Sequence, residues 1–430
     1  MASRTTLCLF AVLLAASCAK APNGSSGGAT PSRESAARAT VAKANAPTSP
    51  RSQQALPTTD PAIAIGNFDG EFVAAQQMLA KDPRSVGGYV AMTSLLLMRG
   101  ALYGKLADYD TAATMSERAV ALAPKAPKAW LARSAVHSRF HEFPAALADL
   151  DRAAKLGGGE VAVEVMQRRA SIQQAMGKLT DARPVIERLA RELPSLQTIG
   201  TLATLDVDSG DPEKAEREFN DALDHFPAVS PFPLVWLWLQ QANMWEAEGS
   251  PARAAELLEA AHARMPADVA VTSHWASAEV AHGHRAHAVA LLRSLVAGSD
   301  DPEYAGQLAE LLGDSDECTP LRERARRGYE ALLARHPAAY ADHAARFYLA
   351  SRTALPRALQ LAELNLRVRQ TAAAFALVID AALANDDRAR ACAAASAAKQ
   401  SGATSGQLAW QSARAFAACG KPAQTTASAP

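Results

Sequence analysis

Histidine is the residue type whose clustering in this chain most suggests chemistry. Five of the ten histidines fall between positions 262 and 287: His262, His274, His282, His284 and His287. Three of them, at 282, 284 and 287, are spaced closely enough to bind Zn²⁺ or Cu²⁺. No cysteine or acidic residue is adjacent to them, and they fall where a solvated turn between two helices is expected. We therefore predict no metal site, and we keep a metal-binding or enzymatic accessory role of residues 262–287 as the alternative.

The motifs on which common catalytic and cofactor sites are built are missing from the sequence. It contains no Gly-rich nucleotide-binding loop, no Cys-x-x-Cys and no His-Glu-x-x-His. The pair His141-Glu142 is followed by Phe143-Pro144, and proline interrupts the helix that would present a second histidine ligand. We predict a non-enzymatic protein with no catalytic residue and no cofactor.

Charge and composition limit both the partners and the fold. Lysine and arginine number 44 against 44 aspartates and glutamates, so no net field attracts nucleic acid or an acidic membrane surface. The chain is rich in alanine, the best helix former, and aromatic residues make up only 6% of it. Sheets would require β-branched and aromatic residues in alternating runs. We therefore predict an all-α fold and no nucleic-acid partner.

The N-terminal segment has the pattern of an export signal. A basic residue precedes an apolar run, residues 7–16, which is too short to span a bilayer. The run ends in Leu14-Ala15-Ala16-Ser17-Cys18, which resembles the bacterial lipobox, although alanine stands at position 15 where leucine is usual. The resemblance implies removal of residues 1–17 and attachment of a diacylglycerol to Cys18. The alternative is an ordinary signal peptide cut after Ser17.

The residues after the lipobox indicate a location and a tether. Ala19 stands where lipoproteins retained in the inner membrane carry aspartate, so the resemblance implies a lipid anchor in the outer membrane of a bacterial cell envelope, facing the periplasm. Residues 18–60 are rich in Ala, Ser, Thr and Pro and show no hydrophobic periodicity, which predicts a disordered tether. A similar composition predicts a disordered tail at residues 420–430.

Between these segments the sequence repeats itself. Alanines that open an amphipathic helix recur at nearly regular intervals: Ala112, Ala146, Ala182, Ala215, Ala254 and Ala288. A small residue stands twelve places before each of them, and four of the six positions twelve places after them are proline. A period of about 34 residues with this pattern resembles the tetratricopeptide repeat.

The resemblance implies an all-α solenoid over residues 61–419, a right-handed superhelix of about eight to nine antiparallel helix pairs with capping helices. In this family the first helix of each pair lines a concave groove that binds proteins or extended peptides. Transferring the groove positions to this sequence gives the candidate partner-binding residues Lys128, Arg139, Gln167, Ser171, Gln174, Trp236 and Asn243. Asn243 stands where peptide-clamping members place an asparagine that bonds the ligand backbone.

The resemblances to the repeat and to the lipobox together imply a function and a class of partner. We expect a lipid-anchored envelope scaffold that binds envelope proteins or extended peptides, in processes such as outer-membrane, pilus or secretin, or cell-wall assembly. It would contact the membrane only through its N-terminal lipid.

Three cysteines fall in the predicted solenoid: Cys318, Cys392 and Cys419. Cys392 is expected early in one helix and Cys419 just after the antiparallel terminal helix, so both could lie at the same end of that pair. A disulfide between them is one outcome. The other is that the unequal helix lengths hold their Cα atoms beyond the limit of about 7 Å. Cys318 falls in an expected insertion loop and is expected to be unpaired.

Overall fold

The structure is a computed structural model that describes residues 56–226, 229–313 and 315–420. All regular secondary structure in these ranges is α-helical, which confirms the predicted fold class. The first ten helices are α2 (Pro61–Lys81), α3 (Val86–Tyr103), α4 (Ala107–Leu122), α5 (Pro127–Arg139), α6 (Phe143–Leu156), α7 (Glu160–Ala175), α8 (Leu179–Glu192), α9 (Leu196–Asp208), α10 (Pro212–Asp224) and α11 (Pro231–Ala247). They are followed by α12 (Pro251–Arg264), α13 (Val269–Ala281), α14 (Arg285–Gly298), α15 (Pro302–Leu312), α16 (Cys318–Arg335), α17 (Pro337–Ser351), α18 (Leu355–Val368), α19 (Ala372–Ala384), α20 (Arg388–Ser401) and α21 (Gly406–Ala418).

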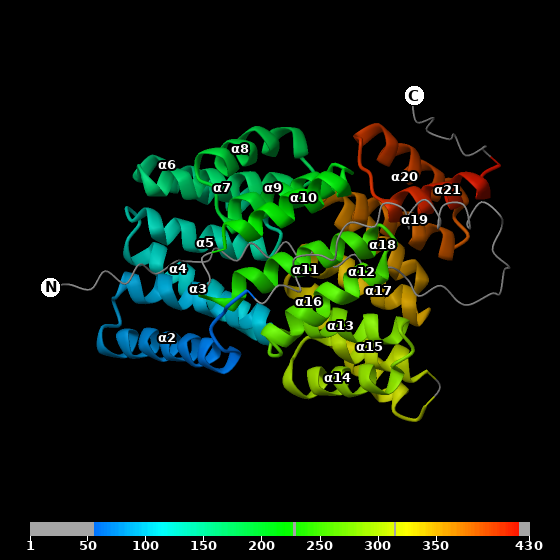
Figure 1. Cartoon of the computed structure of the whole chain (residues 1–430), viewed down its shortest axis with the longest axis horizontal. Coiled ribbons are helices and arrows are strands. Elements are labelled where there is room, and N and C mark those ends of the chain that lie inside the picture. The colour runs from blue at the N-terminus through cyan, green and yellow to red at the C-terminus, as the bar shows by residue number, and fades with distance from the viewer. Residues whose placement is uncertain (1–55, 227–228, 314, 421–430) are drawn as a thin grey trace.

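Consecutive helices pack on each other as pairs. Within the described ranges there are nine such pairs, from α3–α4 to α19–α20, and α2 and α21 flank them. Each pair also packs on the next pair along the chain, so the helices form a continuous coil rather than separate domains (Figure 1). The predicted solenoid of helix pairs is therefore confirmed.

The small residues of the repeat lie at the contacts between paired helices. The six alanines that define the repeat register are 0–1% exposed. Gly100 of α3 is buried against Tyr109 of α4, and a Cβ at position 100 would overlap the tyrosine ring. Because protein interiors are close-packed, any larger residue at these positions would push the helices apart. The alanine content of the chain thus reflects the close approach of its helices.

The coil closes on itself, so that pairs distant in sequence are in contact. The Ser299 hydroxyl and the Asp300 amide, which follow α14, both donate hydrogen bonds to the Gly104 carbonyl, at 2.7 and 3.1 Å. His336, at the start of α17, pairs with Asp110 of α4 over 2.7 Å. These contacts join the first helix pair to the two turns that flank the seventh pair, α15–α16.

A second set of contacts closes the middle pairs against the C-terminal ones. The Gln370 amide, in the turn between α18 and α19, donates a hydrogen bond to the Met176 carbonyl at the end of α7, at 3.1 Å. The Gly406 amide donates to Oε1 of Glu248, just after α11, at 2.9 Å. The family resemblance implied an open groove along the inner helices. Closure of the coil instead places the chain's own turns across that face.

Cys392 of α20 and Cys419, the residue after α21, form a disulfide with Cα atoms 6.7 Å apart. This bond decides between the two outcomes that the sequence left open, and it fastens the terminal helix to its neighbour. Cys318 is the free cysteine of the described residues. It lies in the first turn of α16 rather than in a loop, and it is buried.

Several predicted features lie at or beyond the edges of the described residues. The signal segment 1–17, the lipidation site Cys18, residues 19–55 of the tether and residues 421–430 of the tail all lie outside them. Residues 56–60, which the sequence places in the tether, make hydrogen bonds to the solenoid, including one of 2.8 Å from the Thr59 amide to the Val229 carbonyl. Among the helices of the described ranges, none has the length and apolar character that crossing a membrane requires.

Candidate functional site

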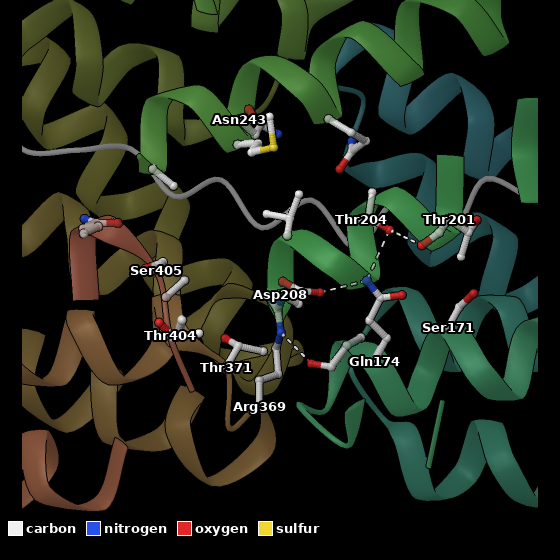
Figure 2. A pocket seen from close by; sticks show the side chains of 18 of the residues that line it. Ser171, Gln174, Thr201, Thr204, Asp208, Asn243, Arg369, Thr371, Thr404 and Ser405 are labelled. Carbon is white, nitrogen blue, oxygen red and sulfur yellow. Dashed lines mark hydrogen bonds between the residues drawn. The ribbon is translucent and has the colours of Figure 1, made fainter. Parts of the chain in front are cut away.

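A pocket of about 150 Å³ lies on the inner side of the coil, where the middle pairs meet the C-terminal pairs (Figure 2). One wall comes from α7, α9 and α11, and the other from the turns that precede α19 and α21. Its charged lining residues are Asp208 and Arg369. Most of the other lining side chains are neutral amides and hydroxyls: Ser171, Gln174, Gln197, Thr201, Thr204, Gln240, Asn243, Thr371, Thr404, Ser405 and Gln407.

The repeat register explains why polar side chains gather on the first wall. Ser171, Thr204 and Asn243 each directly follow the buried alanine that packs against the second helix of the pair. In a helix with about 3.6 residues per turn, the same register gives the same direction in each pair. The three side chains therefore line the pocket from three consecutive first helices, α7, α9 and α11.

The Trp236 side chain of α11 packs against the hydrophobic core and also lines the pocket. Its indole ring packs on Gly200 of α9, where a Cβ would overlap the ring. The side chain also belongs to the hydrophobic cluster around α9, α11 and α12, yet it is only partly buried and contributes to the pocket lining. The aromatic surface that remains exposed in the pocket is available to a ligand.

Asp208 is the acidic side chain of the pocket. Gln174 Nε2 donates a hydrogen bond of 2.8 Å to Asp208 Oδ2 and a second of 3.2 Å to Thr204 Oγ1 (Figure 2). Burial raises the pKa of Asp208 to about 6, although the Gln174 hydrogen bond and the charge of Arg369 both act to lower it. The carboxylate is therefore ionised at neutral pH in a setting that disfavours its charge.

Arg369, in contrast, has its charge matched by a neighbour outside the pocket. Its Nε donates to the Ala175 carbonyl at 3.3 Å, and its Nη1 lies 3.8 Å from Asp342 Oδ2. Both side chains of this pair are buried. Burial alone would raise the pKa of Asp342, but His343 and Arg369 outweigh it and lower the pKa to about 2. Arg369 thus acts mainly as a brace between α7 and α17.

The structure brings together four of the seven side chains that the sequence proposes as partner-binding: Ser171, Gln174, Trp236 and Asn243 all line the pocket. The other three lie elsewhere. Lys128 is exposed at the start of α5, and Gln167 lies one turn before Ser171, whose hydroxyl bonds its backbone carbonyl.

Arg139 is drawn into the closed coil. Its guanidinium carbon lies 4.4 Å from the centre of the Tyr109 ring, and its Nε is buried without a hydrogen-bond partner. The sequence-based register places Arg139 in the groove. In the structure its guanidinium packs on the ring of Tyr109 instead.

Sequence reasoning missed Asp208, Arg369, the residues of the second wall and four polar residues of the first wall: Gln197, Thr201, Thr204 and Gln240. Asp208 occupies the repeat position of Ala175 and Ala247, which also line the pocket, so the register could have identified it. Arg369 and Thr404 lie in turns of the last pairs, and no local pattern signals that these turns meet α7 and α9.

The clustered histidines are divided among several partners, and two of them share Glu279. Nδ1 of His284 and of His287 lie 3.2 and 2.6 Å from Oε2 of Glu279. His274 pairs with Glu246 over 3.0 Å, and His262 lies 3.2 Å from the Thr272 hydroxyl. In the part of the chain that the structure describes, no group of three or more His, Cys, Asp or Glu side chains is arranged to hold a metal ion.

No protein-family model matches the chain, and no curated protein matches its sequence. Among solved structures, the chain is similar to a tetratricopeptide repeat protein from Parabacteroides merdae, at 14% identity over 61% of this chain and 94% of that one, with a TM-score of 0.38. The tetratricopeptide repeat domain of P58(IPK) aligns over 83% of this chain and 95% of that domain, at 14% identity and a TM-score of 0.28. Human IFIT1, solved as a dimer with PPP-AAAA, aligns over 73% of this chain and 72% of that one, at 15% identity and a TM-score of 0.45. These likenesses concern the fold alone, and an all-α solenoid of the tetratricopeptide-repeat type is the fold that the helix pairs and the sequence repeat describe.

Proposed function

We propose that the protein is a non-enzymatic scaffold that binds segments of partner proteins in the pocket on the inner side of its closed coil. The observation that carries this proposal is the pocket lining, to which eleven residues with neutral amide or hydroxyl side chains contribute together with apolar side chains such as Trp236 and Met244. Peptide groups each carry one N–H donor and one C=O acceptor, and amides and hydroxyls pair with both.

The lining also favours binding over catalysis. Hydroxyl nucleophiles need a base within hydrogen-bond reach, most often a histidine, and the lining of this pocket contains no histidine, cysteine or lysine. Its one carboxyl group, on Asp208, accepts a hydrogen bond from Gln174, and its one guanidinium, on Arg369, braces two helices. The pocket is therefore suited to holding a ligand.

We further propose that the scaffold works in the envelope of a bacterium, anchored through a lipid on Cys18 in the outer membrane. The lipobox-like sequence supports this location. The disulfide between Cys392 and Cys419 agrees with it, because such bonds persist in oxidising compartments such as the periplasm. Partners would then be envelope proteins that take part in outer-membrane, pilus or secretin, or cell-wall assembly.

Site-specific photocrosslinking tests the binding site. A photoreactive side chain is placed at Gln240, which lines the pocket, and as a matched control at Glu259, which is exposed on α12 of the same helix pair. The full-length protein is irradiated in cells. We expect discrete adducts from position 240 that position 259 does not give. The same adducts from both positions, or none from position 240, would contradict the proposal.

Metabolic labelling tests the anchor. With an alkyne-bearing fatty acid supplied to the cells, the wild-type protein should carry the label and fractionate with the outer membrane. Cys18→Ser should lose the label and appear in the soluble periplasmic fraction. A labelled Cys18→Ser protein, or an unlabelled wild type, would rule out lipidation at this residue.

A further inference from the structure

The space that the pocket offers to a ligand is small. Its volume is about 150 Å³, and a cavity of about this volume holds one benzene-sized molecule. Its second wall is formed by the chain's own turns, in which Gln370 bonds Met176 and Gly406 bonds Glu248. A partner that binds here can insert one side chain or one chain end, while the rest of the partner stays outside.

The charge that an inserted group would meet is that of Asp208. Of the two charged residues in the lining, Arg369 is already paired with the buried carboxylate of Asp342, and its Nε is bound to the Ala175 carbonyl. Asp208 receives one hydrogen bond from a neutral amide, Gln174, and that amide brings no charge to balance the carboxylate. Asp208 is therefore an acidic group whose hydrogen-bond donor, Gln174, carries no charge, while Arg369 acts on it only through space.

The elements that face Asp208 add neutral groups that both donate and accept hydrogen bonds, and one charged group, Arg369. The α9 and α7 side chains beside it are Thr204 and Gln174. Across the pocket, α11 contributes Gln240 and Asn243, and the turn before α21 contributes neutral side chains; Arg369, in the turn before α19, is the one charged group that faces it. The carboxylate, amide and hydroxyl oxygens of this space can accept from a group that only donates hydrogen bonds. An ammonium group, with three donors and no acceptor, is such a group.

We propose that the pocket binds a side-chain-sized primary ammonium group of the partner, such as the head of a lysine, with Asp208 as its counter-ion. The inference rests on the proposed function, because it takes this pocket as the place where the partner binds. A bound cation would offset the cost of burying the carboxylate, which in the free protein holds the pKa of Asp208 at about 6.

Two small molecules of similar size, one charged and one neutral, distinguish binding through charge from binding through shape. n-Butylammonium and n-butanol have similar volumes, and only the first is a cation. Their binding to the full-length protein is measured by saturation-transfer NMR at pH 7.5, with titration to obtain affinities. We expect n-butylammonium to bind at least about tenfold more tightly than n-butanol, the ratio that one charge interaction of about 1.4 kcal/mol provides.

A pair of variants locates the effect. Asp208→Asn keeps the size of the side chain and an oxygen that accepts from Gln174, and it should abolish the preference for n-butylammonium. Asp221→Asn removes the same charge from an exposed position on α10, outside the pocket lining, and should retain the preference. Circular dichroism of both variants verifies that they are folded. Equal affinities of the wild type for the two probes, or the same loss in both variants, would overturn the inference.

The pH dependence gives an independent readout. n-Butylammonium stays protonated between pH 7.5 and pH 5, whereas the Asp208 carboxyl gains its proton as the pH falls through about 6. The affinity of the wild type should therefore fall by about tenfold over this interval, and that of Asp208→Asn should stay constant. If both proteins showed the same pH dependence, Asp208 would not be the counter-ion.

The outcome is separable from that of the proposed function. Crosslinks from position 240 together with no preference for n-butylammonium would retain the scaffold and overturn the cation site. Preferential binding of n-butylammonium together with no crosslinks would establish the cation site and contradict the protein-binding role.

Discussion

The backbone of Gln370 crosses directly over Gly177. The Gln370 carbonyl oxygen occupies the space that a Cβ at position 177 would need, and the Gln370 amide donates a hydrogen bond of 3.1 Å to the neighbouring Met176 carbonyl. Gly177 has a φ angle of 80°, in the region that glycine tolerates best. Two separate requirements, backbone conformation and lack of a side chain, therefore meet at one residue, and the second exists only because the coil closes.

Gly177→Ala should destabilise the closed coil. Gly283 is the matched control, because its φ angle is 83° and nothing lies within 4 Å of the position of its Cβ. Both substitutions carry the cost of the positive φ angle, but only Gly177→Ala adds the overlap with Gln370. We expect Gly177→Ala to lower the free energy of unfolding by about 1–3 kcal/mol more than Gly283→Ala does. Urea denaturation of both variants measures the difference, and equal values would mean that the closure contact is absent in solution.

Replacing a helical glycine with alanine should lower the free energy of unfolding at Gly100 and raise it at Gly66. At Gly100 an added methyl group would overlap the Tyr109 ring, whereas at Gly66, exposed on α2, it would meet nothing within 4 Å. Gly100→Ala should therefore lower the free energy of unfolding by about 1–3 kcal/mol through overpacking. Gly66→Ala should raise it by about 0.5–1 kcal/mol through helix propensity. Thermal melting distinguishes the two, and a shift of the same sign in both variants would disprove the packing of α3 on α4.

Asp208→Asn should change how stability depends on pH. The pKa of Asp208 is raised to about 6 in the folded protein, above the value of 3.8 for a free aspartate, so the folded state holds the proton more tightly than the unfolded state. The wild type therefore loses stability as the pH rises from about 4 to above 6, by up to about 3 kcal/mol. Asp208→Asn removes this loss and should be the more stable protein at pH 8, with the difference vanishing near pH 4. Chemical denaturation at a series of pH values tests this, and parallel curves for the two proteins would contradict the buried carboxyl.

Removing the disulfide should loosen the terminal helix. The cysteines are 27 positions apart, and in the chain-entropy model a crosslink of this span contributes about 3–4 kcal/mol. In the double variant Cys392→Ala/Cys419→Ala, we expect faster hydrogen exchange of α21 amides and unchanged exchange in α3–α6. Addition of a reductant should reproduce the effect in the wild type and leave the double variant unaffected. If exchange in α21 were the same with and without the bond, the disulfide would not stabilise this end of the coil.

The helix pairs could be predicted from the sequence because they depend on local spacing. A small residue such as Gly100, twelve positions before Ala112, is required wherever the two helices of a pair meet. The same small residue therefore recurs in every repeat and can be recognised in the sequence. The same register places Ser171 and Asn243 on the inner face, so part of the first wall of the pocket could also be predicted from the sequence.

The other half of the pocket depends on the curvature of the whole coil. Small rotations between pairs add up until residues 194 positions apart, Ala175 and Arg369, come into contact. The pattern of a single repeat does not contain the total rotation of the coil, so the sequence could not predict that Arg369 and Thr404 line the pocket.

The two-walled pocket also imposes an order of events during synthesis. A ribosome delivers the chain from its N-terminus, so α7, α9 and α11 are complete long before the turn at residues 404–407 exists. A chain that ends before residue 404 lacks Thr404, Ser405 and Gln407 of the second wall. The complete pocket therefore exists only after residues 404–407 have been synthesised.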